Sequence, residues 1–294
     1  MQRSFLGYFS MRITIYVLAL CCLYGVESAS RADEADAEMR AQWRHIFDGI
    51  AADYKLAGGP EGRAFALVDR PAYTWARSGP HGGTYGAVYI WTELGNAEAV
   101  ACFWRNPGND GTLSIVHELH SLSPAVLKSA GKDSDSWKPK AGLKRHPLAD
   151  APLPMASATG RMQQMRTLCR DFTAKSVSSR GDRTELRLLP QPLYRYESTN
   201  PNIVDGALFA FVCSIGTDPE AFLLLEVING ADGPRWQYAL ARFSHMNLFV
   251  NFKDREVWQA LRDQDNPISH NADHTYWVFH QPFDGMKRDA SNRK

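Results

Sequence analysis

The sequence lacks the charge bias that marks proteins binding nucleic acids or anionic membranes. Its 294 residues carry 33 lysines and arginines against 32 aspartates and glutamates, a formal net charge of +1. The first 32 residues contribute a charge of +2, which leaves about −1 on the rest of the chain. A near-neutral chain offers no broad electrostatic surface for a polyanion. We therefore expect no nucleic acid among the partners.

Cysteine is also scarce, and two of the five cysteines lie within the first 32 residues. The other three are Cys102, Cys169 and Cys213, an odd number at wide spacing. This does not make a disulfide framework, although one bridge remains open in an oxidising compartment. No CxxC pair and no Cys/His zinc pattern is present. We interpret all three as buried structural cysteines, and we predict no cofactor.

The N-terminal segment has no apolar run long enough for a membrane span. Arg3 and Arg12 precede an uncharged run over 13–26, shorter than the roughly 20 residues that a spanning helix needs. Small residues follow at cleavage-site positions up to Ala32. This pattern predicts a signal peptide over 1–32 and a secreted or periplasmic protein without an integral span after cleavage. A lipoprotein is disfavoured, because neither cysteine of this segment follows a small residue.

What the chain does contain is a pattern that recurs once. Residues 40–75 lie over 161–196 without a gap. Identical pairs are Arg40/Arg161, Gln42/Gln163, Leu67/Leu188, Pro71/Pro192 and Tyr73/Tyr194. The order and nearly constant offset of these matches predict an internal duplication. They also predict that the rings at the paired positions Trp75/Tyr196 and Trp91/Phe211 are buried.

Each copy is typical of one helix followed by four strands. Apolar residues recur at helical spacing over 39–54 and 161–175. Short aromatic and β-branched runs follow, bounded by turn formers. We place these strands at 65–75, 86–92, 99–105 and 113–120, and at 186–196, 207–213, 221–228 and 236–243. The predicted fold class is α+β, with two tandem α-β-β-β-β units, each an antiparallel meander with one helix packed on a face.

The predicted organisation follows from this pattern. It comprises the signal peptide, a first repeat over 33–123, a Pro-rich crossover linker over 124–154, a second repeat over 155–246, a C-terminal extension over 247–286 and a disordered tail over 287–294. Within the extension we expect strands at 248–252 and 276–279, and a short helix over 255–262.

Five motifs of the chain carry a resemblance to other proteins. They are LPQPLYRY at 189–196, DGALFAFV at 205–212, GTDPE at 216–220, WQYALAR at 236–242 and HELHSLS at 117–123. Together they resemble a family of uncharacterised bacterial secreted proteins over most of the mature chain. The resemblance implies export and a single functional unit, and it implies no activity, cofactor or catalytic residue.

The segment His117-Glu118-Leu119-His120 differs from the zinc-protease motif. Its histidines are three apart and lie in a predicted strand, where alternation places Glu118 and His120 on one face. A metal site using Glu118 and His120 is one interpretation, and a hydrogen-bonded strand end is the other.

Two hairpins suggest paired polar groups at one end of the predicted sheets. Folding each about its Asp-Gly turn sets Glu98 opposite His120 and Glu220 opposite Arg242. These residues, with Glu118, are the candidate catalytic groups. The alternative is a pair of cross-strand ion pairs without a catalytic role.

The densest set of potential metal ligands lies near the C-terminus. His270, Asp273 and His274 are the candidates there, and surface histidines are the alternative. The glycine-rich stretch over 79–86 leads into a strand rather than a helix, so it is not a phosphate loop, and no Gly-x-Ser-x-Gly elbow occurs.

These patterns favour a binding or interaction module over other classes of protein. A hydrolase using carboxylate and histidine groups as general acid and base is the first alternative. A structural component of the envelope is the second. Whether the protein is an enzyme, what ligand it binds and in what oligomeric state it exists are open at this point.

Overall fold

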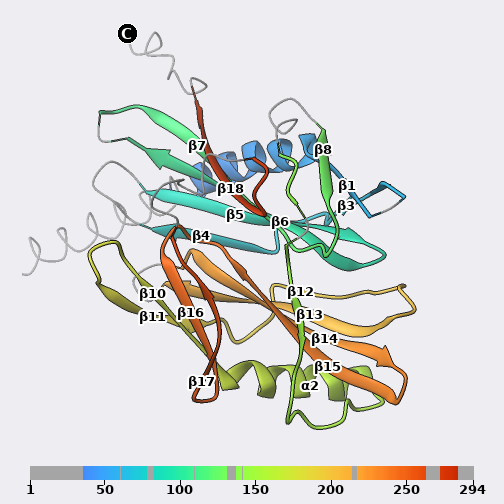
Figure 1. The fold of residues 1–294 in the computed structure, drawn as a ribbon. Coiled ribbons are helices and arrows are strands. Elements are labelled where there is room, and N and C mark those ends of the chain that lie inside the picture. The colour runs from blue at the N-terminus through green and yellow to red at the C-terminus, as the bar shows by residue number, and fades with distance from the viewer. Residues whose placement is uncertain are drawn as a thin grey trace, which may run out of the picture. The chain divides into compact units, whose positions relative to one another are not determined.

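The computed structural model describes residues 36–59, 61–77, 83–108, 110–130, 137–140, 142–213, 217–262 and 272–283. The predicted signal peptide and the predicted C-terminal tail lie outside these residues. The chain divides into two compact units, Met1–Ile46 and Phe47–Lys294. A helix over 36–53 contributes to both. Within the first unit, Arg40 forms an ion pair with Asp36 one helical turn earlier. The strands all belong to the second unit (Figure 1).

The first large sheet has six antiparallel strands in the order β18-β7-β6-β5-β3, with β4 also paired to β5. The strands are β3 (Ala66–Leu67), β4 (Tyr73–Arg77), β5 (Thr84–Glu93), β6 (Asn96–Pro107), β7 (Leu113–Ser121) and β18 (Tyr276–Pro282). Leu94 and Gly95 join β5 to β6 with φ values of 51° and 80°. Two positive φ values are typical of the tight turn that matches the twist of a hairpin.

The second large sheet has nine strands in the order β17-β16-β10-β11-β13-β14-β15-β9, with β12 also paired to β13. Its strands are β9 (Arg145–Pro147), β10 (Phe172–Val177), β11 (Arg183–Leu188), β12 (Tyr194–Arg195), β13 (Ile203–Cys213), β14 (Pro219–Gly230), β15 (Gly233–Arg242), β16 (Asn247–Phe252) and β17 (Arg255–Ala260). A small third sheet joins β2 (Arg63–Ala64), β1 (Lys55–Gly58) and β8 (Leu127–Ala130).

The α2 helix (Ala158–Leu168) packs on the second sheet through Met162, Met165 and Leu168. A short 3-10 turn, η1 (Cys169–Asp171), follows it. At its start, the Ser157 hydroxyl accepts a hydrogen bond from the Gly160 amide at 3.1 Å, which satisfies an amide that the helix leaves open.

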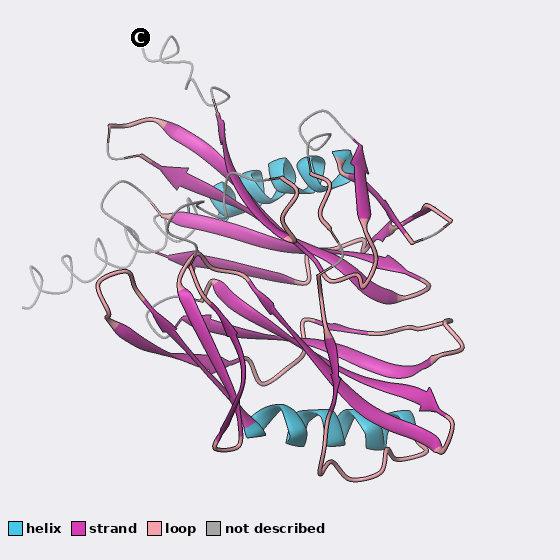
Figure 2. Ribbon diagram, viewed as in Figure 1, coloured by secondary structure: helices cyan, strands magenta, loops and turns pink. Residues whose placement is uncertain are grey.

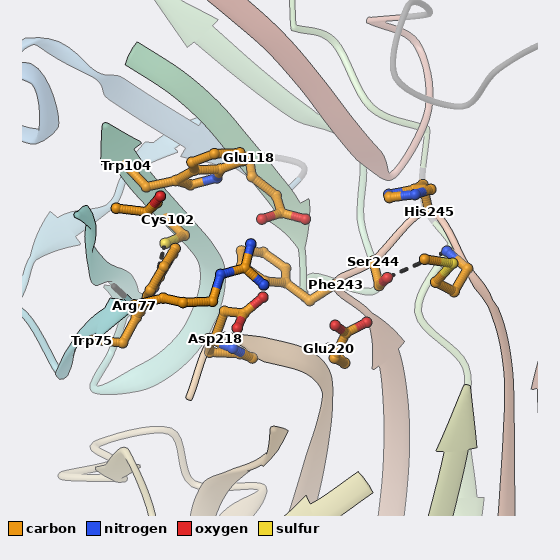
Figure 3. Close-up of a pocket in the computed structure, with 13 residues that line it drawn as sticks. Trp75, Arg77, Cys102, Trp104, Glu118, Asp218, Glu220, Phe243, Ser244 and His245 are labelled. Atoms are coloured by element: carbon orange, nitrogen blue, oxygen red, sulfur yellow. Dashed lines mark hydrogen bonds between the residues drawn. The ribbon is translucent and has the colours of Figure 1, made fainter. Parts of the chain in front are cut away.

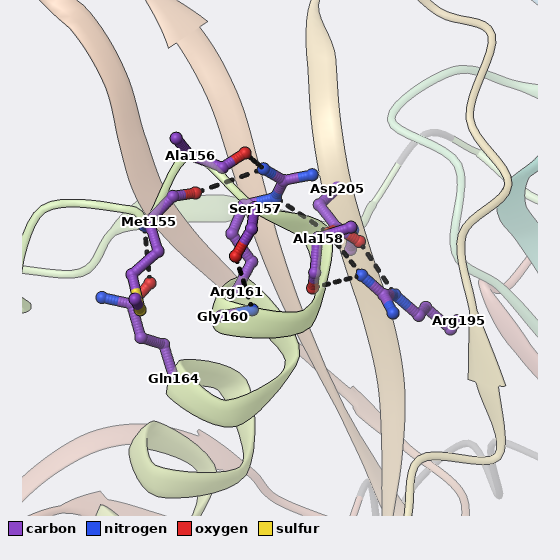
Figure 4. A network of polar contacts seen from close by, with 10 residues as sticks. Met155, Ala156, Ser157, Ala158, Gly160, Arg161, Gln164, Arg195 and Asp205 are labelled. Carbon is purple, nitrogen blue, oxygen red and sulfur yellow. Dashed lines mark hydrogen bonds and ion pairs between the residues drawn. The ribbon is translucent and has the colours of Figure 1, made fainter.

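Two arginines fasten this helix start to the sheet. The nearly buried carboxylate of Asp205 accepts hydrogen bonds from Arg161 Nε at 2.9 Å and from an Arg195 terminal nitrogen at 2.8 Å (Figure 4). The same arginines also donate to the backbone carbonyls of Ala156 and Ala158. Because every charged group here has a partner, this cluster is a structural one.

The two large sheets face each other as two layers of the second unit (Figure 2). A shared apolar core lies between them, with Val88, Val100 and Cys102 from the first sheet and Leu208, Phe222 and Leu224 from the second. Residues that alternate with these in β13 and β14 pack against α2 instead. Both faces of these strands are therefore covered, and that explains their nearly continuous apolar sequences.

An aromatic ring lies directly over a glycine in each large sheet. Trp75 pairs with Gly86 across β4 and β5, and a methyl group on Gly86 would lie 2.3 Å from Trp75 Cε2. Tyr196 covers Gly206 in the same way, with a closest distance of 2.5 Å. The prediction that the rings of Trp75, Tyr196, Trp91 and Phe211 are buried is confirmed.

The predicted fold class of two tandem α-β-β-β-β units is wrong. The chain is mostly β, and its strands form large sheets of nine and six members rather than two four-stranded meanders. The helical spacing over 161–175 extends past the true end of α2 at Leu168. Phe172 and Ala174 alternate with exposed or half-buried neighbours and begin β10. Residues 255–260, which we expected in a short helix, form strand β17.

The segments outside the expected repeats also build the sheets. The crossover over 124–154 supplies β8 and β9, and the extension over 247–286 supplies β16, β17 and β18. Apart from the local β16–β17 hairpin, these strands pair with distant parts of the chain, and β18 lies beside β7 although more than 150 residues separate them. No local pattern in the sequence encodes such a partner.

Candidate functional site

A cavity of about 270 Å³ opens at one end of the interface between the two large sheets. Trp75, Trp104 and Phe243 supply its aromatic walls, and Glu118, Asp218 and Glu220 supply its acidic groups. Arg77, Cys102, Ser244 and His245 complete the part of the lining that matters to its chemistry. Figure 3 shows the side chains of Arg77, Glu118, Asp218 and Phe243 directed towards one space.

Strand alternation explains how these groups meet. Cys102 and Glu118 are direct partners across β6 and β7, and Cys102 faces the second sheet. Glu118 therefore shares that inward face. On the second sheet, Glu220 precedes Phe222 by two positions in β14, and Phe222 also faces inward. The acidic groups of the two sheets thus point into the same gap.

Glu118 is buried, and burial disfavours its charged form. Burial is the largest cause that raises the pKa of this carboxyl to about 8, and the nearby charges of Glu220 and Asp218 act in the same direction. A hydrogen bond of 2.5 Å from the Tyr276 hydroxyl opposes the shift. Glu118 therefore keeps its proton at neutral pH.

Glu220 and Asp218 lie at the start of β14. Burial raises the pKa of Glu220 to about 7, and a hydrogen bond with Ser244 opposes the rise. One oxygen of each residue, Glu220 Oε2 and Asp218 Oδ1, is buried without a hydrogen-bond partner among the described residues. A buried acceptor without a donor costs free energy, so such groups call for an explanation.

Two arginines near the cavity differ in what they contact. Arg242 donates to the backbone carbonyls of Ser244, Met246 and Leu261 at 2.9–3.1 Å, which orders the segment after β15. Arg77 lies on β4 at the mouth, where its side chain is exposed. Its guanidinium makes no hydrogen bond or ion pair with any other residue that the structure describes.

Cys102 lies at the inner wall of the cavity. The indole Nε1–H of Trp75 donates to its sulfur at 3.3 Å. Burial raises the pKa of this thiol, which keeps it protonated. Cys102 and Cys169 are buried and Cys213 is partly exposed, and within the described residues none of the three is in a disulfide.

The two predicted cross-strand pairs do not form. His120 lies opposite Val100, and the carbonyl of Glu98 instead accepts from the Leu122 amide at 2.8 Å. Arg242 lies opposite Ala221 rather than Glu220. Relative to the prediction, the pairing of β6 with β7 is shifted by two residues, and the pairing of β14 with β15 is shifted by one. A shift of one residue moves a side chain to the other face of the sheet.

His120 does not line the cavity. Its Nδ1–H donates to the Ser121 carbonyl at 2.7 Å. Burial is the largest cause that lowers its pKa, to about 4, so the ring is neutral at physiological pH.

Glu98 belongs to a separate buried cluster. Glu226 is fully buried and accepts two hydrogen bonds from Arg145, at 2.8 and 3.2 Å. Tyr196 and Gln237 donate to the same carboxylate at 2.9 and 2.6 Å. Burial raises the pKa of the neighbouring Glu98 to about 7. Because the Glu226 carboxylate is fully partnered, we assign this cluster to stability.

The other histidine of the His-Glu-Leu-His segment, His117, is part of the core. Its Nδ1 accepts from the Tyr54 hydroxyl, and its Nε2–H donates to Gln281 Oε1, each at 2.8 Å. The Phe279 ring stacks on it at 4.3 Å between centroids.

Of the predicted metal ligands, His270 lies outside the described residues. The backbone carbonyls of Asp273 and His274 accept hydrogen bonds from the Lys140 amide and the Trp137 indole. In the part of the chain that the structure describes, no group of three or more His, Cys, Asp or Glu side chains is arranged to hold a metal ion.

Sequence reasoning found Glu118 and Glu220 but missed the other residues of the cavity. Asp218 lies in the Gly-Thr-Asp-Pro-Glu motif, where two acids flank a proline at the start of a strand. That motif was a usable signal. Arg77 and Trp104 carried none, because their place depends on how the two sheets pack.

Comparison of the chain with protein-family models, with curated proteins and with solved structures found no match. None of the described helices combines the length and the apolar character that crossing a membrane requires. The proposals on function therefore rest on the geometry of the cavity alone.

Proposed function

We propose that the protein binds a small organic cation, a protonated amine with an apolar part, in the cavity between the two sheets. The observation that carries the proposal is the pair of buried carboxylate oxygens, Asp218 Oδ1 and Glu220 Oε2, that have no donor among the described residues. An ammonium group has three N–H donors and a positive charge, and it would satisfy both oxygens once the two carboxyl groups turn towards it, because neither oxygen is solvent-accessible as it stands.

The aromatic walls support the same class of ligand. Trp75, Trp104 and Phe243 line the cavity beside the acids. Aromatic faces attract cations and also pack against apolar groups. At about 270 Å³, the cavity falls just under the roughly 300–1,000 Å³ of pockets for drug-sized ligands. It therefore suits a ligand smaller than a drug-sized molecule.

The protonation states fit this ligand as well. Burial raises the pKa of Glu118 to about 8 and that of Glu220 to about 7, so near neutral pH Glu118 is mostly protonated and Glu220 about half protonated. A bound cation favours the charged form of a neighbouring carboxyl and lowers its pKa. Binding is then accompanied by proton release from the cavity.

Calorimetric titration with three phenylethyl probes that differ in their charged or polar end tests this proposal. Phenethylamine carries the cation, 2-phenylethanol is neutral and 3-phenylpropanoate is an anion. We expect the amine to bind with a dissociation constant on the order of 1 mM or tighter, and the other two to bind at least about tenfold more weakly. Equal binding of the amine and the alcohol would overturn the proposal.

Substitutions test whether phenethylamine binds at Asp218 and Glu220. Asp218→Asn and Glu220→Gln keep the shape of the side chains but remove charge, so each should weaken phenethylamine binding by about tenfold, or about 1.4 kcal/mol. Glu185→Gln, at an exposed position of β11, is the matched control and should leave binding unchanged.

A hydrolase is the second candidate, favoured by the raised pKa of Glu118. A carboxyl that keeps its proton at neutral pH can act as a general acid. Incubation with p-nitrophenyl glycosides and esters tests this. Turnover that Glu118→Gln abolishes would support the hydrolase, and absence of turnover in the wild-type protein would count against it.

We also propose that the chain is exported. The basic residues, apolar run and small-residue cleavage site of the first 32 residues support this.

A further inference from the structure

Arg77 gives the cavity a second, opposite charge. It follows Trp75 by two positions in β4, so the two side chains share a face of the strand. Both line the cavity, and the charge of Arg77 acts on Glu220 across it. In Figure 3 the guanidinium extends into the space lined by Glu118 and Asp218.

Among the described residues, the guanidinium of Arg77 makes no hydrogen bond or ion pair, unlike that of Arg242. The guanidinium of Arg242 donates hydrogen bonds to three backbone carbonyls. Arg77 has no such bond to the other described residues, although carboxyl groups line the same cavity. A guanidinium presents paired N–H groups that match both oxygens of a carboxylate.

The cavity therefore offers donors and acceptors that have no partner within the described part of the chain. The first sheet supplies the N–H donors of Arg77, and the second sheet supplies the acceptors Asp218 Oδ1 and Glu220 Oε2. A simple amine satisfies only the acceptors and leaves its charge beside that of Arg77. A simple anion satisfies only Arg77 and meets the acids.

We propose that the ligand is a zwitterion of the amino-acid type, whose carboxylate binds Arg77 and whose ammonium binds Asp218 and Glu220. This inference rests on the proposed function, because it assigns the second pole of a ligand bound at the same site. The aromatic walls formed by Trp75 and Trp104 then receive an apolar side chain. The small volume of the cavity suits a single amino acid rather than a peptide.

Matched pairs of an amino acid and its decarboxylated amine provide the test. The pairs are phenylalanine with phenethylamine, leucine with isopentylamine and valine with isobutylamine, titrated calorimetrically at pH 7.5. In the pair that binds best, we expect the amino acid to bind about tenfold more tightly than the amine.

Variants of Arg77 test whether this residue causes the preference for the amino acid over the amine. Arg77→Met keeps the length of the side chain and should bring the amino acid and the amine within about twofold of each other. Arg77→Lys keeps the charge without the paired N–H groups and should give an intermediate preference. Arg183→Met, an exposed arginine at the start of β11, is the matched control. Melting temperatures of all variants report whether the fold is intact.

The outcomes separate this inference from the proposed function. If the amines bind and the amino acids bind no better, the zwitterionic ligand is overturned while the cation site stands. If the preference survives Arg77→Met in a folded protein, the role of Arg77 is overturned. If neither member of any pair binds, the proposed function fails, and this inference fails with it.

Discussion

The Tyr276 hydroxyl donates a hydrogen bond of 2.5 Å to Glu118 Oε1, although the two residues are 158 positions apart in the sequence. Tyr276 lies on β18, which pairs with β7 at the edge of the first sheet. The strand nearest the C-terminus thus positions a carboxyl group of the cavity. The cavity therefore depends on the pairing of β7 with β18, and this pairing brings distant parts of the chain together.

Glu118 makes stability depend on pH. In the folded chain Glu118 has a pKa of about 8, whereas in the unfolded chain it has the ordinary value of 4.5. The folded state binds more protons between these values, so stability falls as the pH rises from about 4.5 to about 8. Glu118→Gln removes this contribution. We expect the variant to lose less stability than the wild-type protein over that range.

Urea unfolding of both proteins at pH 5 and pH 8 measures this difference. The upper limit of the effect is about 1.4 kcal/mol for each unit of pKa shift. Glu185→Gln serves as the exposed control. An identical pH dependence in Glu118→Gln and the wild-type protein would show that Glu118 is charged in the folded state.

The Arg145–Glu226 pair predicts a large loss of stability. Only 16% of the Arg145 side chain and none of Glu226 is exposed. Glu226→Ala leaves a buried guanidinium without its partner, and we expect a loss of about 3–5 kcal/mol in unfolding free energy. The exposed pair Arg63–Glu61 is the control, and Glu61→Ala should cost no more than about 1 kcal/mol. Similar losses in the two variants would contradict this assignment.

Two glycines should respond to alanine in opposite directions. A methyl group on Gly86 would meet the Trp75 ring at 2.3 Å. We expect Gly86→Ala to cost about 1–3 kcal/mol and to weaken phenethylamine binding, since Trp75 is a wall of the cavity. Gly49 lies at an exposed position of the helix over 36–53, where an added methyl group would meet no atom within 4 Å apart from the neighbouring helix backbone. Gly49→Ala should stabilise by about 0.5–1 kcal/mol. Thermal denaturation of both variants measures these changes in stability. A stabilising effect of Gly86→Ala would contradict the packing of the Trp75 ring on Gly86.

Export gives a prediction that does not depend on the cavity. Mass spectrometry of the protein from its native host should find a mature chain that begins at Asp33 or within a few residues before it. An exported form that retains Met1 and stays with the membrane would indicate an anchor instead of a cleaved signal peptide.

Local sequence patterns predicted the strands at the centre of each sheet. The runs at 86–92 and 207–213 fall within β5 and β13, because continuous apolar runs bounded by turn residues mark buried strands. The same patterns failed at the boundary of α2 and β10. Met162, Met165, Leu168 and Phe172 satisfy a helical spacing even though the helix ends at Leu168.

The candidate site was predicted only in part, and the reason is register. Glu118 and Glu220 do line one cavity, but not through the hairpin partners that we expected for Glu220. A register error of one residue exchanges the two faces of a strand. Arg77 and Trp104 line the cavity because the two sheets pack face to face, and no spacing within the sequence encodes that contact.

A crystal structure of the protein soaked with phenethylamine tests the central claim most directly. The proposal predicts electron density for the ligand in the cavity between the sheets, with its nitrogen about 2.7–3.2 Å from both Asp218 Oδ1 and Glu220 Oε2. Its ring should contact Trp75 or Trp104. A ligand bound elsewhere, or a cavity in which ordered water alone satisfies both oxygens at saturating phenethylamine, would contradict the account.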